Sequence, residues 1–238
     1  MKKLDVNLRT YLQQNHNQLT WKERVQITND IICALSRIHH ENAVHRDLHS
    51  GNILYSNDWF ISDFGFCGPV DKPLGSIYGN LPYIAPEVIV GEGYTFASDI
   101  YSIAMLMWEI SSGQPPFANY ENDYDLAMNI VNGMRPKIVS GTPLEYKKLM
   151  KRCWDANPRN RPSIDTLLVE IREINIPFYE QQKYNSTNMQ SNINSNINTN
   201  STELLFRRFS SKIYNFKYLP EPKNASEGRN SYILIFSN

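Results

Sequence analysis

The longest regular pattern in the chain is a stripe of apolar positions spaced three or four residues apart, which predicts a long helix with one side facing a core. Before it, Thr20-Trp21-Lys22-Glu23 has the form of a capping box, in which both polar side chains bond unpaired backbone N–H groups at a helix start. We therefore expect a helix that ends near His40 and whose inner face carries Trp21, Val25, Thr28, Ile31, Ile32, Leu35 and Ile38.

A second helical segment, residues 95–112, is apolar on almost every side. Because a helix without a polar face belongs in the interior, this segment should form the central helix of the fold. Shorter patterns predict further helices over residues 7–14, 123–131, 144–154 and 164–174. The chain is thus predicted to be mainly α-helical.

Two short apolar runs, Ile53-Leu54-Tyr55 and Trp59-Phe60-Ile61, flank the polar turn Ser56-Asn57-Asp58. Apolar runs joined by a short polar turn are typical of a β-hairpin. Such a hairpin would bring the two residues at its open end, Asn52 and Asp63, side by side.

Three oxygen-bearing side chains near this hairpin indicate phosphoryl-transfer chemistry. Such a site needs a carboxylate beside the attacking hydroxyl, and further oxygen ligands to hold Mg²⁺ against phosphate. Asp47, Asn52 and Asp63 supply these groups. Taken singly, they are equally a turn acid, a loop hydrogen-bonding residue and a turn cap.

The same stretch resembles the eukaryotic protein kinases. His45-Arg46-Asp47, followed five residues later by Asn52, is similar to the catalytic-loop motif H-R-D-x-x-x-x-N, and Asp63-Phe64-Gly65 is similar to the D-F-G motif. Three later stretches match in the family's order, in the style of tyrosine kinases and tyrosine-kinase-like serine/threonine kinases: Ala85-Pro86-Glu87, Ser98-Asp99-Ile100-Tyr101-Ser102, and Cys153-Trp154 with Asn157-Pro158 and Arg159-Asn160-Arg161-Pro162.

The resemblance implies a role for each residue of the candidate site. Asp47, in the catalytic loop with Arg46, would accept the proton of the attacking hydroxyl, while Asn52 and Asp63 bind Mg²⁺ and ATP. Leu54 would form the floor of the adenine pocket. His49 stands where serine/threonine kinases usually carry a lysine, and it is either a weaker electrostatic substitute or an exposed loop residue.

Other matched residues are implied to be structural. Asp99 would hold the backbone of the catalytic loop at His45 and Arg46, and Arg161 would form a buried salt bridge with Glu87. An acid at a helix start is also favoured by the helix dipole, which is compatible with that role for Asp99. The remaining residues of this structural set are His45, Phe64 and Gly65.

The segment from Phe66 to Tyr83 reads as an activation loop, and it contains the candidate phosphorylation sites Ser76 and Tyr78. A phosphate there would pair with Arg46 and order the loop; otherwise both are exposed polar residues. Gly79-Asn80-Leu81-Pro82-Tyr83 resembles the substrate-facing motif G-T-x-x-Y of serine/threonine kinases, with Asn80 in place of the threonine. This leaves open whether the acceptor is serine, threonine or tyrosine.

The N-terminal part departs from the family, whose glycine-rich loop, strand lysine and helix glutamate precede the catalytic loop. Residues 1–44 contain no glycine, so no such loop lies there. The predicted fold is therefore a protein-kinase-like large lobe, a helical body with a small β-hairpin at the catalytic loop, without the small β lobe. We place this partial kinase domain at residues 1–176.

From Pro177 the composition changes, and residues 177–238 read as a low-complexity, Asn-rich linker and tail. Residues 185–200 contain seven asparagines and almost no large side chains, which predicts disorder. Leu204–Phe209 and Ile213–Phe216 are open to two interpretations: a short amphipathic basic helix or docking segment, or a solvated, partly ordered tail.

Charge and cysteine content exclude some classes of function. Residues 1–176 carry 17 basic and 20 acidic side chains and residues 177–238 carry 7 and 4, which does not favour nucleic-acid binding. No apolar run is long enough to span a membrane. Widely spaced Cys33, Cys67 and Cys153 favour a reducing compartment, so we expect a cytoplasmic protein, with the nucleus as the alternative.

Three hypotheses follow. The first is a protein kinase that uses ATP and Mg²⁺ to phosphorylate serine or threonine, with tyrosine less favoured, and that has little activity as this chain alone. The second is a pseudokinase-like interaction or regulatory module without catalysis. The third is a fragment of a longer kinase. In each, a partner chain is a candidate for covering the exposed cleft.

Overall fold

The computed structural model describes residues 6–71, 76–185 and 210–224. Its α-helices are α1 (Leu8–Asn15), α2 (Trp21–His40), α3 (Pro86–Ile89), α4 (Phe96–Ser112), α5 (Asp123–Val131), α6 (Leu144–Cys153) and α7 (Ile164–Asn185). Short 3₁₀ helices lie at η1 (His16–Gln18), η2 (Ser50–Asn52), η3 (Phe64–Phe66), η4 (Leu81–Tyr83) and η5 (Pro158–Asn160).

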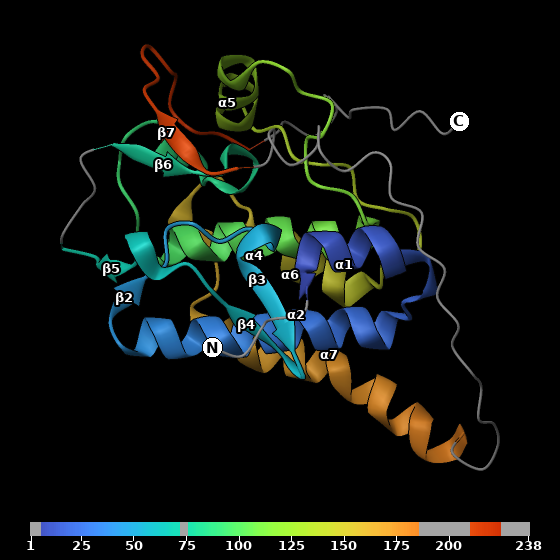
Figure 1. Cartoon of the computed structure of the whole chain (residues 1–238). Coiled ribbons are helices and arrows are strands. Elements are labelled where there is room, and N and C mark those ends of the chain that lie inside the picture. The colour runs from blue at the N-terminus through green and yellow to red at the C-terminus, as the bar shows by residue number, and fades with distance from the viewer. Residues whose placement is uncertain (1–5, 72–75, 186–209, 225–238) are drawn as a thin grey trace.

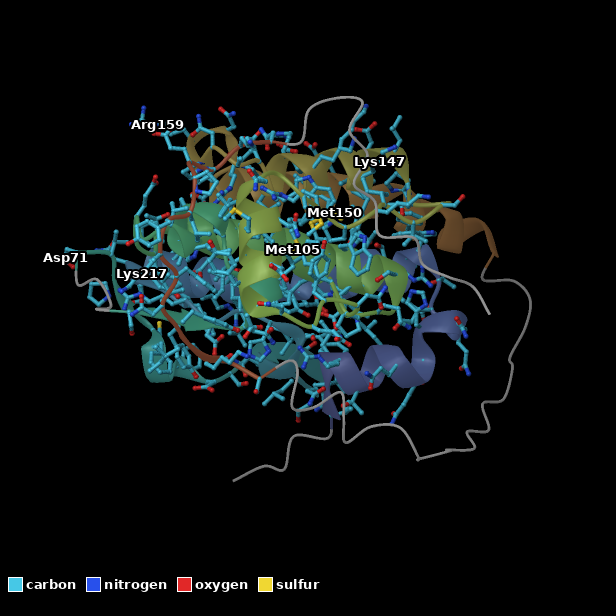
Figure 2. All side chains as sticks on the ribbon, turned by 90° about the horizontal axis from the view of Figure 1, so that it is seen from above. Asp71, Met105, Lys147, Met150, Arg159 and Lys217 are labelled. Carbon is cyan, nitrogen blue, oxygen red and sulfur yellow. The ribbon has the colours of Figure 1, made fainter. Side chains whose placement is uncertain are left out.

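Helix α4 runs through the middle of the molecule, with α2 and α6 packed on it and α7 lying alongside α2 (Figure 1). Met105 of α4 and Met150 of α6 are both fully buried, and Figure 2 shows them near the centre while the labelled charged side chains lie toward the edge. The prediction of a buried helix over residues 95–112 is confirmed. None of the helices in the described ranges is long and apolar enough to cross a membrane.

The predicted starts of the first two long helices are also present. The Asn7 side chain accepts a hydrogen bond from the Thr10 N–H at 2.9 Å and caps α1. Thr20 and Glu23 form the predicted capping box of α2, since each side chain accepts from the other residue's backbone N–H. Local capping chemistry therefore fixes where these helices begin.

Three small sheets surround the catalytic loop. The predicted hairpin is β3 (Ile53–Ser56) and β4 (Asp58–Ile61), joined at Asn57 with φ +71°, and β1 (Val6–Asn7) extends it in the order β1-β3-β4. The other two are antiparallel pairs: β2 (Ala43–Val44) with β5 (Gly68–Pro69), and β6 (Ile77–Gly79) with β7 (Lys212–Tyr214).

The C-terminal part differs from the prediction in the length of one helix, and it favours one of the two interpretations of the tail. Helix α7 continues past Ile174 to Asn185 with Pro177 inside it, although proline lacks the N–H that would bond the carbonyl four residues back. Most of residues 210–224 are exposed, but Tyr214 is buried and Phe216 and Leu219 pack against the core, which favours the docking-segment interpretation of Ile213–Phe216 over the solvated tail. Apolar contact thus outweighs the polar composition there. The Asn-rich stretch after residue 185 and Leu204–Phe209 lie outside the described residues.

Candidate active site

The catalytic loop starts after β2 with an unusual backbone turn, which Asp99 of α4 holds in place. Arg46 has φ +72°, a left-handed conformation that is unfavourable for a side-chain-bearing residue. The almost fully buried Asp99 carboxylate accepts from the N–H groups of His45 (2.8 Å) and Arg46 (3.0 Å) and from the His39 ring at 3.0 Å. The contact implied for Asp99 is therefore present.

His45 connects the loop to the end of the hairpin. Its Nδ1 accepts from the Asp47 N–H at 3.3 Å, so its Nε2 carries the proton that is donated to the Ser62 carbonyl at 3.0 Å. Its fully buried ring also packs edge-on against Phe64, with centroids 5.7 Å apart. His45 thus links Asp47 to Ser62, the residue before Asp63.

Asp47 presents a buried carboxylate to a serine hydroxyl. Its Oδ1 accepts from the Ser211 hydroxyl at 2.7 Å, and the His49 ring lies 3.7 Å from the same oxygen. Burial opposes ionisation, but His49, the Ser211 hydroxyl and His45 together hold the pKa of Asp47 below its usual value. The carboxylate is therefore ionised at neutral pH and can accept a proton.

Asn52 is joined directly to Asp47, and Asp63 is brought to the same place by the hairpin. The Asn52 side-chain amide donates to the Asp47 carbonyl at 3.0 Å and to its Oδ2 at 3.4 Å. Ser62 donates its N–H (2.8 Å) and its hydroxyl (2.9 Å) to the Asn52 carbonyl, which sets Asp63 beside it. Burial, together with the nearby carboxylates of Asp47 and Asp63, raises the pKa of Tyr78.

The donor set of Asn52 and Asp63 fits Mg²⁺ bound to phosphate. Mg²⁺ in such sites takes one or two protein oxygen ligands and completes its shell with phosphate oxygens and water. The Asn52 amide nitrogen is used on Asp47, so its oxygen is the atom left for a cation, and the exposed Asp63 supplies a carboxylate. No cluster of three or more histidine, cysteine or acidic residues that could hold a metal occurs in the described ranges.

Arg161 and Glu87 form the ion pair that the resemblance implies. The two side chains meet through paired hydrogen bonds of 2.6 and 2.7 Å, and both are buried. The guanidinium also donates to the carbonyls of Asp155 (2.9 Å) and Ala97 (2.8 Å) and lies over the Tyr101 ring. This pair joins the end of the activation segment to the helical body.

Comparisons with known proteins agree with this geometry. Residues 4–171 match the family described as protein tyrosine and serine/threonine kinase. This chain belongs to that family. It is 32% identical over 172 residues to a probable LIM domain-containing serine/threonine-protein kinase of Dictyostelium discoideum, covering 71% of this chain and 26% of that protein. A dual specificity protein kinase of the same organism is 31% identical over 192 residues, covering 72% and 25%.

A putative serine/threonine-protein kinase/receptor of Acanthamoeba polyphaga mimivirus is 31% identical over 159 residues, covering 65% of this chain and 10% of the viral protein. The chain thus spans about a quarter or less of the length of these kinase relatives. The kinase-like fold predicted from the motifs is confirmed at the level of the family. The absence of a small lobe stays a prediction.

The remaining predicted residues lie around this kinase site with varied exposure. Leu54 is partly buried and lies on the central strand β3, opposite Asn7 of β1 and Phe60 of β4. Its place in an adenine pocket stays a prediction. Phe64 is 54% exposed and Gly65 is exposed, donating its N–H to the Asp63 carboxylate at 3.4 Å. The Phe64 ring is therefore held by its edge-on contact with His45 and not by burial in the core.

Arg46 binds the backbone of the activation segment. Its guanidinium donates to the carbonyls of Phe66 (3.2 Å) and Pro69 (2.6 Å). Tyr78 stacks on Phe66 with ring centroids 3.6 Å apart. The Tyr94 hydroxyl accepts a hydrogen bond from the Tyr78 N–H and donates one to the Tyr78 carbonyl. Ser76 is exposed. Phosphorylation of Ser76 or Tyr78 remains a prediction.

Sequence reasoning missed three contacts of the site. Ser211 lies in the tail, 164 residues from Asp47 along the chain, and its sequence context carries no sign of that contact. The Tyr94 hydroxyl bonds the activation segment at Tyr78 and the His39 ring donates to Asp99, and sequence patterns assigned neither residue to the site. Only His39, a polar residue in the last turn of an apolar helix face, offered a signal.

Proposed function

We propose that this chain carries the catalytic and protein-substrate-binding part of a protein kinase that transfers phosphate from ATP to serine or threonine. One observation carries the proposal: the ionised, buried Asp47 carboxylate receives a serine hydroxyl at 2.7 Å. That is the geometry a general base requires toward the hydroxyl it deprotonates. Family membership and the names of the relatives support the same reaction class.

Each site residue has one task in this proposal. Asp47 orients the acceptor hydroxyl and takes its proton. Asn52 and Asp63 hold Mg²⁺, and Leu54 lines the adenine pocket. Mg²⁺ and ATP, when bound, supply the phosphoryl group and the positive charge that stabilises its transfer. Asp99 acts through the backbone of Arg46 and is a positioning residue.

The rate of the chain alone should be low. In the family, a glycine-rich loop and a lysine hold the phosphates, and residues 1–44 contain no glycine. Positioning and electrostatics supply almost all of phosphoryl-transfer catalysis, so a site without these groups is slower by orders of magnitude. The lack of glycine in residues 1–44 also favours the second candidate function, a regulatory or interaction module that binds protein partners without catalysis.

Incorporation of phosphate from labelled Mg-ATP into a generic serine/threonine substrate distinguishes these functions. We expect slow incorporation that Asp47→Asn abolishes. A matched control, Asp165→Asn, changes an aspartate that is 71% exposed and lies on α7, so its rate should equal that of the unchanged chain. Incorporation that survives in Asp47→Asn contradicts the assignment of Asp47. No incorporation in any variant leaves the interaction module as the better function.

A further inference from the structure

The C-terminal segment reaches the active site as a strand added to the activation segment. Strand β7 pairs antiparallel with β6, with Tyr214 opposite Ile77 and Lys212 opposite Gly79 (Figure 1). Ser211 directly precedes Lys212, and its hydroxyl lies 2.7 Å from Asp47 Oδ1. Strand addition to an exposed edge is a common way for proteins to bind extended peptides, with backbone bonds giving affinity and alternate side chains giving specificity.

A directed chain of hydrogen bonds holds the Ser211 hydroxyl. His49 Nδ1 accepts from the Gly51 N–H at 3.1 Å, so His49 Nε2 carries the proton. That N–H donates to Ser211 Oγ at 3.1 Å, and the Ser211 hydroxyl in turn donates to Asp47 Oδ1 at 2.7 Å. The serine oxygen is thereby oriented and its proton is directed at the carboxylate. His49 is not an exposed loop residue, because its ring is buried in this arrangement.

Two side chains that follow Ser211, those of Lys212 and Tyr214, hold the strand against neighbouring residues. Tyr214 is 8% exposed and stacks on Phe216 with centroids 5.4 Å apart. Lys212 reaches Asp123 of α5 at 2.6 Å. These contacts make Tyr214 the buried anchor of the segment.

Gly79 provides the close approach to the base. It has φ +138°, and a Cβ placed there would lie 3.3 Å from Asp47 Oδ1, the oxygen that receives the Ser211 hydroxyl. A larger residue would crowd the space between β6 and the carboxylate. The acceptor strand therefore depends on a glycine opposite Lys212.

From this geometry we propose that residues 210–219 form an internal substrate strand that occupies the acceptor-peptide site, with Ser211 as its phosphoacceptor. The proposal rests on the kinase function above. It also defines a substrate class: an extended peptide with a serine, a basic residue directly after it and an aromatic residue three positions after it.

Transfer of phosphate to Ser211 replaces one phosphorus–oxygen bond with another. Ser211 Oγ forms a bond to the terminal phosphorus of a nucleoside triphosphate, and the bond from that phosphorus to its bridging oxygen breaks. The hydroxyl proton goes to Asp47, and a nucleoside diphosphate leaves. The product places a doubly negative phosphate against the Asp47 carboxylate, which repels it. Phosphorylation should thus release the strand and open the site to other protein substrates.

The docking is tested without any nucleotide. In hydrogen–deuterium exchange of the full chain, the amides of residues 77–79 and 212–214 should be protected. Tyr214→Ala should raise their exchange about a hundredfold, because truncating a buried aromatic side chain costs several kcal/mol. Tyr218→Ala removes an aromatic ring that is 94% exposed and should change nothing. Fast exchange in the unchanged chain, or equal effects of both variants, overturns the docking.

The acceptor role is tested by mapping phosphate with mass spectrometry after incubation with Mg-ATP. Phosphate should appear on Ser211 with a rate constant independent of protein concentration, as expected of an intramolecular reaction. Ser211→Ala should lose it and Ser211→Thr should keep it. Phosphate on Ser210 in place of Ser211 contradicts the proposed register.

A peptide added in trans separates this proposal from the proposed function. A peptide with the sequence of residues 207–219 is supplied to the Tyr214→Ala chain, in which the site is open. It should be phosphorylated faster there than by the unchanged chain. If the peptide is phosphorylated while Ser211 of the unchanged chain is not, the kinase function stands and the internal acceptor is wrong. If neither is phosphorylated, both fall.

Discussion

Two regions that meet at Asp47 are held in different ways. The catalytic loop and the end of the activation segment are fixed by buried charged groups: Asp99 accepts three hydrogen bonds, two of them from the loop backbone, and Arg161 binds Glu87 and two backbone carbonyls. The internal substrate strand is held by a pair of three-residue strands, one buried tyrosine and one half-exposed ion pair. The first region is held by buried charges of the folded core, whereas the second docks on the body through few contacts, of which Tyr214 is the most buried.

This difference separates what the site needs from what regulates it. A buried charge that loses its partner is costly, because water cannot replace the partner. An exposed ion pair contributes little, because water and salt compete with it. The base should therefore stay in place when the strand leaves, and the following changes test that separation.

The largest effect is expected for Arg161→Ala. It leaves Glu87 as an unpaired buried carboxylate, which should lower the free energy of unfolding by about 3–5 kcal/mol. Urea unfolding measures this. Arg159→Ala, at the exposed arginine two residues earlier that Figure 2 places at the edge of the molecule, should change it by less than about 0.5 kcal/mol. Similar values for both variants would mean that the ion pair is not what joins the activation segment to the body.

Asp99→Asn should come next. The amide cannot accept from all three of its present donors as a carboxylate does, so we expect a loss of about 1–3 kcal/mol and an altered turn at Arg46. Unfolding by urea gives the first quantity, and the amide NMR shifts of His45 and Arg46 report the second. Asp165→Asn again serves as the control on an exposed carboxylate. Unchanged loop shifts would remove Asp99 from its positioning role.

Tyr214→Ala sharpens the comparison, because its effect should be local. The β6–β7 pair should open, and the free energy of global unfolding should fall by no more than the docking free energy that hydrogen exchange reports, about 1.4 kcal/mol for each tenfold change in exchange, since the rest of the core does not rest on this residue. Urea unfolding and hydrogen exchange on the same sample measure both quantities. A global loss as large as that of Arg161→Ala would make the strand part of the core.

Lys212→Ala should have a smaller effect. Its ion pair with Asp123 is half exposed, so the change should weaken strand docking by less than about 1 kcal/mol, and added salt should reduce that difference. Exchange of residues 212–214 at low and high salt gives the answer. Lys217→Ala, another exposed lysine of the same segment, should show no effect. A large and salt-independent effect of Lys212→Ala would mean that it is an anchor like Tyr214.

The smallest expected effect is on the titration of Asp47. Its folded pKa is depressed, so the stability that it contributes is present above its unfolded pKa and is lost as the pH falls through the folded pKa. Ser211→Ala removes one of the groups that lower this pKa and should raise it, which carboxyl-carbon NMR titration can measure. Ser210→Ala is the control. An unchanged pKa in Ser211→Ala would contradict the hydrogen bond between Ser211 and Asp47.

The sequence by itself determined the helical body and named the candidate residues of the site. Helix α2 and its capping box, the buried helix α4 and the β3–β4 hairpin follow from patterns within a few turns of chain, where neighbouring residues decide the local structure. The motif spacing also named Asp47, Asn52, Asp63, Asp99 and Arg161, because each lies in a short stretch with a recognisable form.

Only the tertiary structure decided what lies against the base. Ser211 reaches Asp47 across 164 residues of sequence, on a three-residue strand too short to leave an alternating pattern. Its position depends on the free edge of β6, the glycine at residue 79 and a place for Tyr214, which exist only once the body has folded. Local patterns encode local elements, whereas pairing between distant segments is decided by the surface that folding creates.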